Sequence, residues 1–169
     1  MAITRRFIGI DPGKNGALAC IWEHTGRVQI WDFDGSYGSH WLPVSYLDDP
    51  YDKSETHVVV EDVCGRPGQS VVANTTFMKL AGQAEYIGWY LAADGYFQKV
   101  RPQTWKKHFG IIGNKSMSKT EKKKLSIELA RKLYPELADM LIASKDGRSE
   151  ALLMALYGKH KYDEQISKC

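Results

Sequence analysis

The stretch FIGIDPGKNGALA, residues 7–19, joins a short apolar run to an acidic residue and a glycine-rich turn. The four residues before Asp11 have the composition of a buried β-strand. An aspartate before Pro-Gly is a common turn opener, so Asp11 alone fits either a turn or a charge held at a functional position. Pro12 biases Asp11 toward an extended backbone, which carries the strand as far as the carboxylate.

A second apolar run ends in the same way. The segment THVVVEDV, residues 56–63, reads as a buried strand that is followed by Glu61 and Asp62. Successive side chains of a strand point to opposite faces, so only one of these two acids can share a face with Asp11. We assign Glu61 to the candidate site and leave Asp62 out of it.

The remaining elements follow from apolar spacing and from start and stop signals. Ser118 followed by Glu121 is a capping box, which predicts a helix that ends before Pro135. Residues 34–56 read as an irregular connection with one short helix around residues 40–47. The other expected elements are a hairpin over 17–33 with its turn at 24–26, helices over 70–93, 103–110 and 148–160, and a strand over 95–102.

This order of elements predicts an α/β fold in one domain, residues 1–169. Two hairpin arms followed by strands that alternate with helices imply a mixed five-stranded sheet with helices packed on it. If the helical crossovers are right-handed, the two strands that end in Asp11 and Glu61 lie in the centre of the sheet.

Two further acids, Asp146 and Glu150, stand four residues apart at the start of the last predicted helix, on one face of it. Four carboxylates converging at the end of a buried sheet would be costly without a compensating cation. Hard oxygen ligands favour Mg²⁺ or Mn²⁺, and two such ions about 4 Å apart are a known arrangement for phosphodiester cleavage. Each acid also has an ordinary interpretation, such as a surface strand end for Glu61 or a helix cap for Asp146.

Positive charge is concentrated in one part of the chain. Residues 99–132 hold eleven Lys and Arg against two acids, a net charge of +9, whereas the rest of the chain carries −6. Such a segment suits a polyanionic partner such as DNA, although a solvated lysine-rich helix face has the same composition.

Composition also narrows the class of protein. A chain of 169 residues with 43% hydrophobic and 25% charged residues is typical of a globular domain. No apolar run approaches the roughly 18 residues of a membrane span, and the N-terminal residues lack a signal-peptide pattern. Three cysteines without metal-ligand spacing argue against a disulfide framework. We therefore expect a cytoplasmic protein with no membrane partner.

Five segments stand in a characteristic order along the chain: FIGIDPGKNGALA, VVVEDV, KLAGQAEYIG, VRPQTWKKHFGIIGNKSMSK and KDGRSEALLMALYG. Together they resemble the RuvC family of Holliday-junction resolvases, and its phage-type members more than the bacterial ones. The resemblance runs from about residue 6 to residue 160, with 34–56 the least similar part. A phage-encoded member would act in the cytoplasm of the host cell.

The resemblance implies an RNase H-like fold with helices on both faces of the sheet, a homodimer, and resolution of four-way junctions and related branched DNA. Cleavage by paired symmetric nicks would leave 5′-phosphate and 3′-hydroxyl ends. By position, the family's four acidic ligands of two Mg²⁺ ions match Asp11, Glu61, Asp146 and Glu150, with Asp11 bridging both ions. Mn²⁺ is expected to substitute for Mg²⁺.

The family's functional lysines fall near Lys106 and Lys119, and Lys119 is the expected catalytic lysine, with Lys107, Lys115 and Lys122 as neighbouring alternatives. The residues expected to contact DNA are Arg66, Gln69, Lys106, Lys107, Lys115, Lys119, Lys122 and Lys123. A fixed positive charge beside the scissile phosphate would stabilise the negative charge that develops there.

The chain departs from the bacterial members in two places. Its final acidic pair is Asp-x-x-x-Glu where they have Asp-x-x-Asp, which leaves the relative roles of Asp146 and Glu150 open. The loop after Glu61 reads CGRPGQS, without the aromatic residue that the bacterial members carry. Arg66 and Gln69 of this loop are expected to contact phosphates instead, with a relaxed sequence preference.

The helix over 70–93 is the candidate dimer contact, with Gly82 and Gly88 allowing close approach and Phe77, Trp89 and Tyr90 supplying area. Core packing is an equal alternative for Trp89. We read Trp105 as an anchor of its helix to the sheet rather than as a base-stacking residue.

Three other functions fit parts of the sequence. The first is another RNase H-like nuclease, acting on flaps or on RNA–DNA hybrids. The second is a non-catalytic module of the same fold that binds branched DNA. The third is an actin-like phosphotransferase, which shares an apolar strand ending in GIDxG but needs a second glycine-rich phosphate loop and about twice the length, and neither is present.

Overall fold

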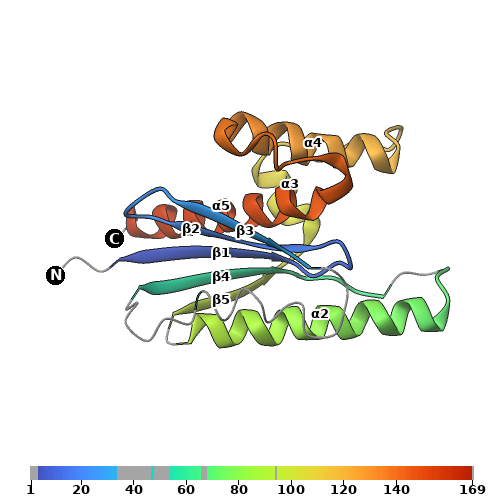
Figure 1. Cartoon of the computed structure of the whole chain (residues 1–169), viewed down its shortest axis with the longest axis horizontal. Coiled ribbons are helices and arrows are strands. Elements are labelled where there is room, and N and C mark those ends of the chain that lie inside the picture. Colours follow the sequence, from blue (N-terminus) through green and yellow to red (C-terminus); the bar gives the residue numbers. More distant parts are fainter. Residues whose placement is uncertain (1–3, 34–46, 48–53, 66–67, 94, 169) are drawn as a thin grey trace.

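Five strands form one mixed sheet in the order β3-β2-β1-β4-β5 (Figure 1). The structure is a computed structural model that describes residues 4–33, 47, 54–65, 68–93 and 95–168. Three strands form an antiparallel meander, β1 (Arg5–Asp11), β2 (Ala17–Trp22) and β3 (Val28–Asp32). The other two run parallel to β1, namely β4 (Glu55–Glu61) beside it and β5 (Tyr96–Val100) at the edge. The predicted mixed sheet, with β1 and β4 in its interior, is confirmed.

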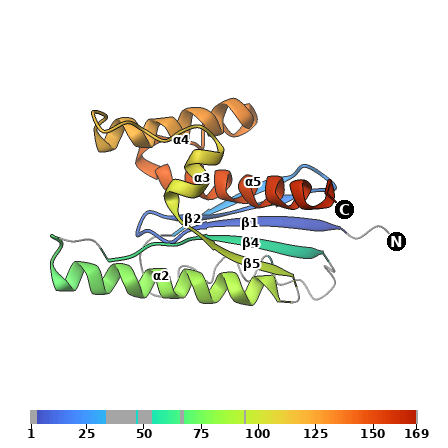
Figure 2. The ribbon, with the colours of Figure 1, turned by 180° about the vertical axis from the view of Figure 1, so that it is seen from behind.

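Helices cover both faces of this sheet (Figures 1 and 2). One long helix, α2 (Val71–Ala92), lies on one face, and α5 (Asp146–Ile166) lies on the other. On the α5 side lie also α3 (Pro102–His108), α4 (Lys119–Leu133) and two 3-10 turns, η2 (Pro135–Leu137) and η3 (Ala143–Lys145). No helix in the described ranges has the length and apolar character needed to cross a membrane.

The alternation of side chains along β1 and β4 divides the core into two halves. Phe7 and Val59 point toward α5 and pack with its apolar residues. Ile8 and Val60 point the other way and pack under α2. By the same alternation the α5 face receives Asp11 and Glu61, because they continue the series of Phe7 and Val59. The strand pattern therefore directs both carboxylates to the face that carries α5.

The close approach of α5 to the sheet depends on a glycine in the central strand. A Cβ atom at Gly9 would collide with the backbone of α5 at Ala151 and Ala155. The absence of a side chain therefore lets a helix backbone rest directly on β1. On the opposite face Gly88 of α2 lies against side chains of the sheet, and an added Cβ there would lie 2.6 Å from a methyl group of Val60.

The last helix is longer than the sequence predicts. We expected residues 148–160, but α5 spans Asp146–Ile166. It begins earlier because η3 leads directly into it, and its final turns carry two ion pairs, Lys159–Asp163 at 2.8 Å and Lys161–Glu164 at 2.7 Å. Such pairs between neighbouring turns support helix beyond the last apolar residue.

Two expectations for α2 are corrected by its packing. Trp89 is 64% exposed, so the alternative that it belongs to the core is wrong. Gly88 faces the chain's own sheet and does not provide an approach for a partner, whereas an added Cβ at Gly82 would meet nothing within 4 Å. The short helix expected around residues 40–47 lies outside the described residues except for Leu47, which is helical and buried.

We predict that Gly9→Ala lowers the free energy of unfolding by about 3 kcal/mol or more, because the new methyl group would have to displace helix backbone rather than a flexible side chain. Urea denaturation followed by circular dichroism measures the change. The matched control is Gly82→Ala on the open face of α2, which should raise stability by about 0.5–1 kcal/mol through helix propensity. Equal stability of Gly9→Ala and wild type would show that α5 does not depend on this contact.

Candidate active site

Asp11 ends the central strand and turns the chain through a tight loop. The backbone N–H of Gly13 donates to Asp11 Oδ1 at 3.1 Å, and the N–H of Gly16 donates to the carbonyl of Gly13 at 2.9 Å. These bonds hold one carboxylate oxygen of Asp11 on the loop. An Asx-type turn and a functional carboxylate are therefore compatible here, because the turn uses only Oδ1.

Glu61 lies on the neighbouring strand, where the parallel register pairs Ile10 with Val60 just before the two acids. Its Oε1 accepts a hydrogen bond from the indole Nε1 of Trp105 at 3.2 Å. Trp105 is completely buried in the core between the sheet and α5, so the expectation that it anchors α3 to the sheet is confirmed. The anchor also orients Glu61, which the sequence did not indicate.

Asp146 and Glu150 come to the same place from the first turns of α5. Gly147 between them touches the loop that follows β1, and an added Cβ there would lie 2.9 Å from Asp11 Oδ2 and 2.7 Å from the Cα of Gly16. A residue with a side chain at position 147 would separate the helix from the loop. Glycine at this position is therefore what allows acids from the two ends of the chain to meet.

A paired charge fixes the start of α5. Arg148 donates from Nε and Nη2 to the two carboxylate oxygens of Asp32, each at 2.7 Å, and from Nη1 to the carbonyl of Met140 at 2.8 Å. Asp32 ends β3, so this two-pronged pair ties the helix to the sheet. The side chain of Arg148 is thereby held by Asp32, away from the acids on either side of it in sequence. Sequence reasoning did not single out Arg148.

The other three predicted acids all contribute to the electrostatics of Asp11. The pKa of Asp11 is raised well above its usual range, first because burial disfavours the charged carboxylate and then because Glu61, Glu150 and Asp146 add negative charge nearby. Asp62 takes no part in this group and is paired instead with Lys99 at 3.6 Å and Arg101 at 3.9 Å. Leaving Asp62 out of the site agrees with these contacts.

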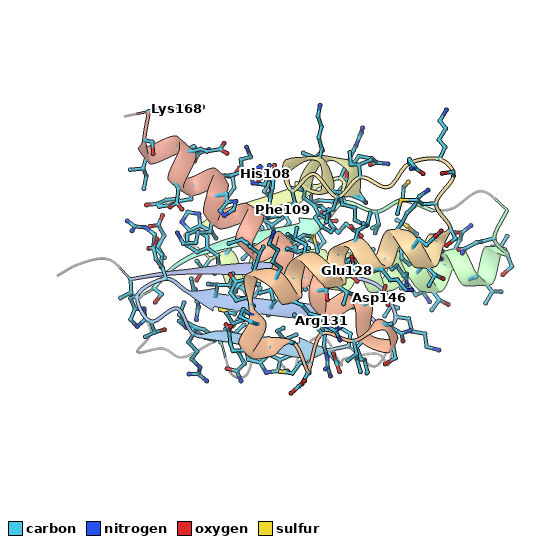
Figure 3. All side chains as sticks on the ribbon, turned by 90° about the horizontal axis from the view of Figure 1, so that it is seen from above. His108, Phe109, Glu128, Arg131, Asp146 and Lys168 are labelled. Atoms are coloured by element: carbon cyan, nitrogen blue, oxygen red, sulfur yellow. The ribbon has the colours of Figure 1, made fainter. Side chains whose placement is uncertain are left out.

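Two lysines partner the acids of α5. Lys106 Nζ of α3 lies 2.7 Å from Glu150 Oε1, which also accepts from the buried hydroxyl of Ser126 at 3.4 Å. Lys123 Nζ of α4 lies 2.5 Å from Asp146 Oδ2. In Figure 3 the ribbon of α4 crosses α5 near the labelled Asp146, which explains how a residue of α4 reaches this acid.

The other expected DNA-contacting residues lie outside this group of contacts. Lys119 is the exposed first residue of α4 and makes no ion pair with any of the four acids in the structure. The side chains of four other expected contact residues are also exposed to solvent: Gln69, Lys107, Lys115 and Lys122. Arg66 lies outside the described residues. The lysines beside the acids are thus Lys106 and Lys123, whereas we expected Lys119 to be the catalytic one.

Ser126 had no sequence signal, because a serine inside a helix has no distinctive pattern.

The donor set suits a hard divalent cation. The group contains four carboxylates, one of them with a raised pKa, and it already attracts two ammonium groups. Within the described parts of the chain, no three His, Cys, Asp or Glu side chains are arranged around a common point as metal ligands. In the present arrangement Glu150 and Asp146 are each turned toward a lysine, and Glu61 toward Trp105.

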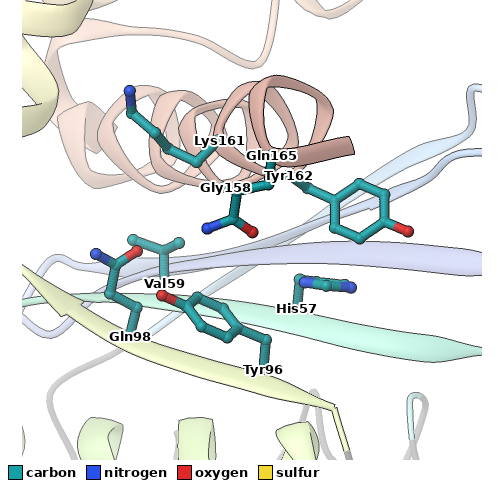
Figure 4. A pocket seen from close by; sticks show the side chains of 8 residues that line it. All are labelled: His57, Val59, Tyr96, Gln98, Gly158, Lys161, Tyr162 and Gln165. Carbon is teal, nitrogen blue, oxygen red and sulfur yellow. The ribbon is translucent and has the colours of Figure 1, made fainter. Parts of the chain in front are cut away.

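A small cavity of about 80 Å³ lies elsewhere, between the sheet and the C-terminal half of α5 (Figure 4). It is lined from the sheet by His57, Tyr96 and Gln98 and from the helix by Tyr162 and Gln165, among others. This volume accommodates a few water molecules rather than a nucleotide. His57 lies near the opposite end of β4 from Glu61, so the cavity is separate from the carboxylates.

Neither a scan against protein-family models nor a search of curated proteins gives a match for this chain.

We predict that Asp11→Asn stabilises the protein at neutral pH. A carboxyl whose pKa is raised by folding destabilises the folded state increasingly as the pH rises from about 4 toward the raised value. Asparagine removes this penalty and keeps an oxygen acceptor for the Gly13 N–H. The midpoint of thermal unfolding should rise by about 2–4 °C for each kcal/mol recovered, and by more at pH 7 than at pH 5.

In the same experiment Mg²⁺ should raise the unfolding midpoint of the wild type but not that of Asp11→Asn. The control is Asp62→Asn, a neighbouring strand-end acid with its own cationic partners, which should keep the response to Mg²⁺. A lower midpoint for Asp11→Asn at neutral pH would contradict the charge crowding described above.

Proposed function

We propose that this chain is a divalent-metal-dependent endonuclease with an RNase H-like fold, related to the RuvC family, that resolves four-way DNA junctions. The observation that carries the proposal is the meeting of four acids at one end of the sheet. Two of them end adjacent parallel strands and two lie one turn apart on the helix packed over those strands. The arrangement supports the family resemblance that the sequence motifs suggested.

In the proposed reaction Asp11, Glu61, Asp146 and Glu150 would hold the cations. Bound Mg²⁺ or Mn²⁺ would supply an activated water and stabilise the leaving oxygen of the phosphodiester. The protein's own contributions are to fix these carboxylates, through the Gly13 N–H for Asp11 and Trp105 for Glu61, and to bring ammonium groups to the same place. Lys106 and Lys123, which contact two of these carboxylates, would lie beside the reacting phosphate.

The exposed lysines of α3, of α4 and of the segment between these helices favour a nucleic-acid substrate. Helices α3 and α4 and the segment between them lie on the side of the sheet that carries the acids. Their solvent-exposed cations include Lys107, Lys115, Lys119, Lys122 and Lys124. Charges of this kind bind the phosphate backbone independently of sequence, with an affinity that falls as salt rises. This distribution of charge matches a long polyanion better than a small phosphorylated metabolite.

The exposed face of α2 is the proposed contact between two copies of the chain. Exposed residues spaced by three or four along it form one stripe, which is apolar at Val71, Met78, Tyr86 and Trp89 and also includes Thr75 and Gly82. Paired nicks in a junction with two-fold symmetry need two active sites related by a two-fold axis. A second copy that buries this stripe would supply the second site.

Cleavage of a synthetic four-way junction tests the proposed activity. Wild-type protein with Mg²⁺ should produce symmetric nicks on opposing strands, and Asp11→Asn or Glu150→Gln should lower the rate by at least about a hundredfold. Linear duplex, flap and RNA–DNA hybrid substrates serve as competitors, and Asp62→Asn serves as the matched active control. Preferred cutting of hybrid or flap would indicate a different nuclease, and junction binding without cleavage would indicate a non-catalytic module.

Light scattering after size exclusion tests the dimer. We predict that Trp89→Glu converts a dimer into a monomer, because it replaces the largest exposed apolar side chain of this contact with a charge. The control is Ile166→Glu, which changes an exposed apolar residue, 52% accessible, at the far end of α5 and should leave the dimer intact. A wild-type protein that is monomeric at concentrations giving paired nicks would exclude this contact.

A further inference from the structure

Two ammonium groups occupy the carboxylates that the proposed function assigns to metal ions. Lys106 Nζ lies 2.7 Å from Glu150 Oε1, and Lys123 Nζ lies 2.5 Å from Asp146 Oδ2. Both acid side chains are mostly enclosed, with 13% of Glu150 and 16% of Asp146 exposed. These contacts differ from exposed surface ion pairs, because the acids have little access to water.

The charge of the site explains why the lysines are there. The carboxyl groups of Glu61, Glu150 and Asp146 add negative charge around Asp11, and unpaired negative charges in a partly desolvated place are costly. One lysine comes from α3 and one from α4, so each reaches the acids of α5 from a separate helix. Neither lysine lies on the elements that carry the acids. Their long, unbranched side chains can leave the carboxylates without movement of the sheet or of α5.

The same two carboxylates cannot serve an ammonium group and a divalent cation equally well. A cation bound to Glu150 and Asp146 would repel an ammonium group that stays within hydrogen-bonding distance of the same oxygens. The lysines would then need another anionic partner. In the proposed reaction, that partner is a phosphate of the DNA backbone, which binds an ammonium group well.

We propose that Lys106 and Lys123 are internal counter-ions of the cation-free site, which leave Glu150 and Asp146 when divalent cations bind and move to DNA phosphates. This inference rests on the proposed function. It makes cation binding and DNA binding mutually favourable, because each ligand satisfies groups that the other leaves unpaired. By thermodynamic reciprocity, DNA must raise the affinity for the cation by the same factor as the cation raises the affinity for DNA.

The first test is calorimetric titration of the DNA-free protein with Mn²⁺. If the lysines compete with the cation, Lys106→Met should bind Mn²⁺ about ten- to a hundredfold more tightly than wild type, and Lys123→Met should show a smaller gain because Lys123 is more exposed. Methionine keeps an unbranched apolar side chain at each position. The control is Lys124→Met, which removes a neighbouring exposed charge of α4 and should change the affinity little.

The outcomes separate this inference from the proposed function. If wild type binds Mn²⁺, Asp11→Asn does not, and Lys106→Met binds no more tightly than wild type, the lysines are not competitors and the inference is overturned while the metal site stands. If neither wild type nor Lys106→Met binds Mn²⁺, the proposed metal site fails and the inference fails with it. Lys106→Gln provides a second variant in case methionine impairs folding, which circular dichroism checks.

The second test measures the link to DNA. The affinity of wild type for Ca²⁺, which takes the same kind of oxygen ligands as Mg²⁺, should rise several-fold when a four-way junction is bound. In Lys106→Met this enhancement should shrink, because the side chain that would pass from Glu150 to phosphate is absent. An equal enhancement in wild type and Lys106→Met would overturn the transfer of the lysine to DNA.

Discussion

The close contact between the backbone of α5 and the central strand is the constraint on which the site depends. Gly9 permits it in the middle of β1, and Gly147 permits it at the loop after Asp11, where an added side chain would meet the aspartate itself. A helix held at the usual distance from a sheet would leave a layer of side chains between its first turns and the strand ends. Removing that layer is what brings Asp146 and Glu150 to Asp11. The clamp between Arg148 and Asp32 then fixes the rotation of the helix.

The contact brings negative charges close together, and side chains of the neighbouring helices reduce their repulsion. Two strand-end acids and two helix acids would repel one another in a place with little water. Lys106 and Lys123 supply positive charge, Trp105 donates to Glu61, and Ser126 donates to Glu150. The four acids lie on β1, β4 and α5. Helices α3 and α4 carry none of these acids, but their side chains supply the polar partners of three of them. Such a group of acids lowers the stability of the folded state unless its charges are neutralised.

Much of the fold and the positions of the strand-end acids were predictable from local patterns. The strands before Asp11 and Glu61, the glycine-rich turn and the capping box of α4 are all encoded within a few neighbouring residues, and the structure bears out these elements. The grouping of the acids was also predictable, because alternation along parallel strands determines which face receives each side chain.

The partners of the acids were not predictable in the same way. The distance and rotation of α3 and α4 relative to α5 determine which of several similar lysines contact the acids. No local sequence pattern encodes that distance or that rotation, so Lys106 and Lys123 could not be singled out. The exposure of Trp89 likewise depends on which face of α2 meets the sheet. The apolar spacing of α2 is compatible with more than one buried face. The extension of α5 to Ile166 is supported by ion pairs that an apolar periodicity does not detect.

The position of α5 in the chain has a consequence for biosynthesis. Half of the acids belong to the last described helix, whereas Asp11 belongs to the first strand, so the group forms only when segments more than 130 residues apart have met. A nascent chain that has emerged only as far as residue 145 has the strands and α2 but lacks two of the four carboxylates. Contacts between such distant segments carry a loop-closure cost that slows folding. A chain with this order of elements therefore cannot bring the four acids together before the first turns of α5 have been synthesised.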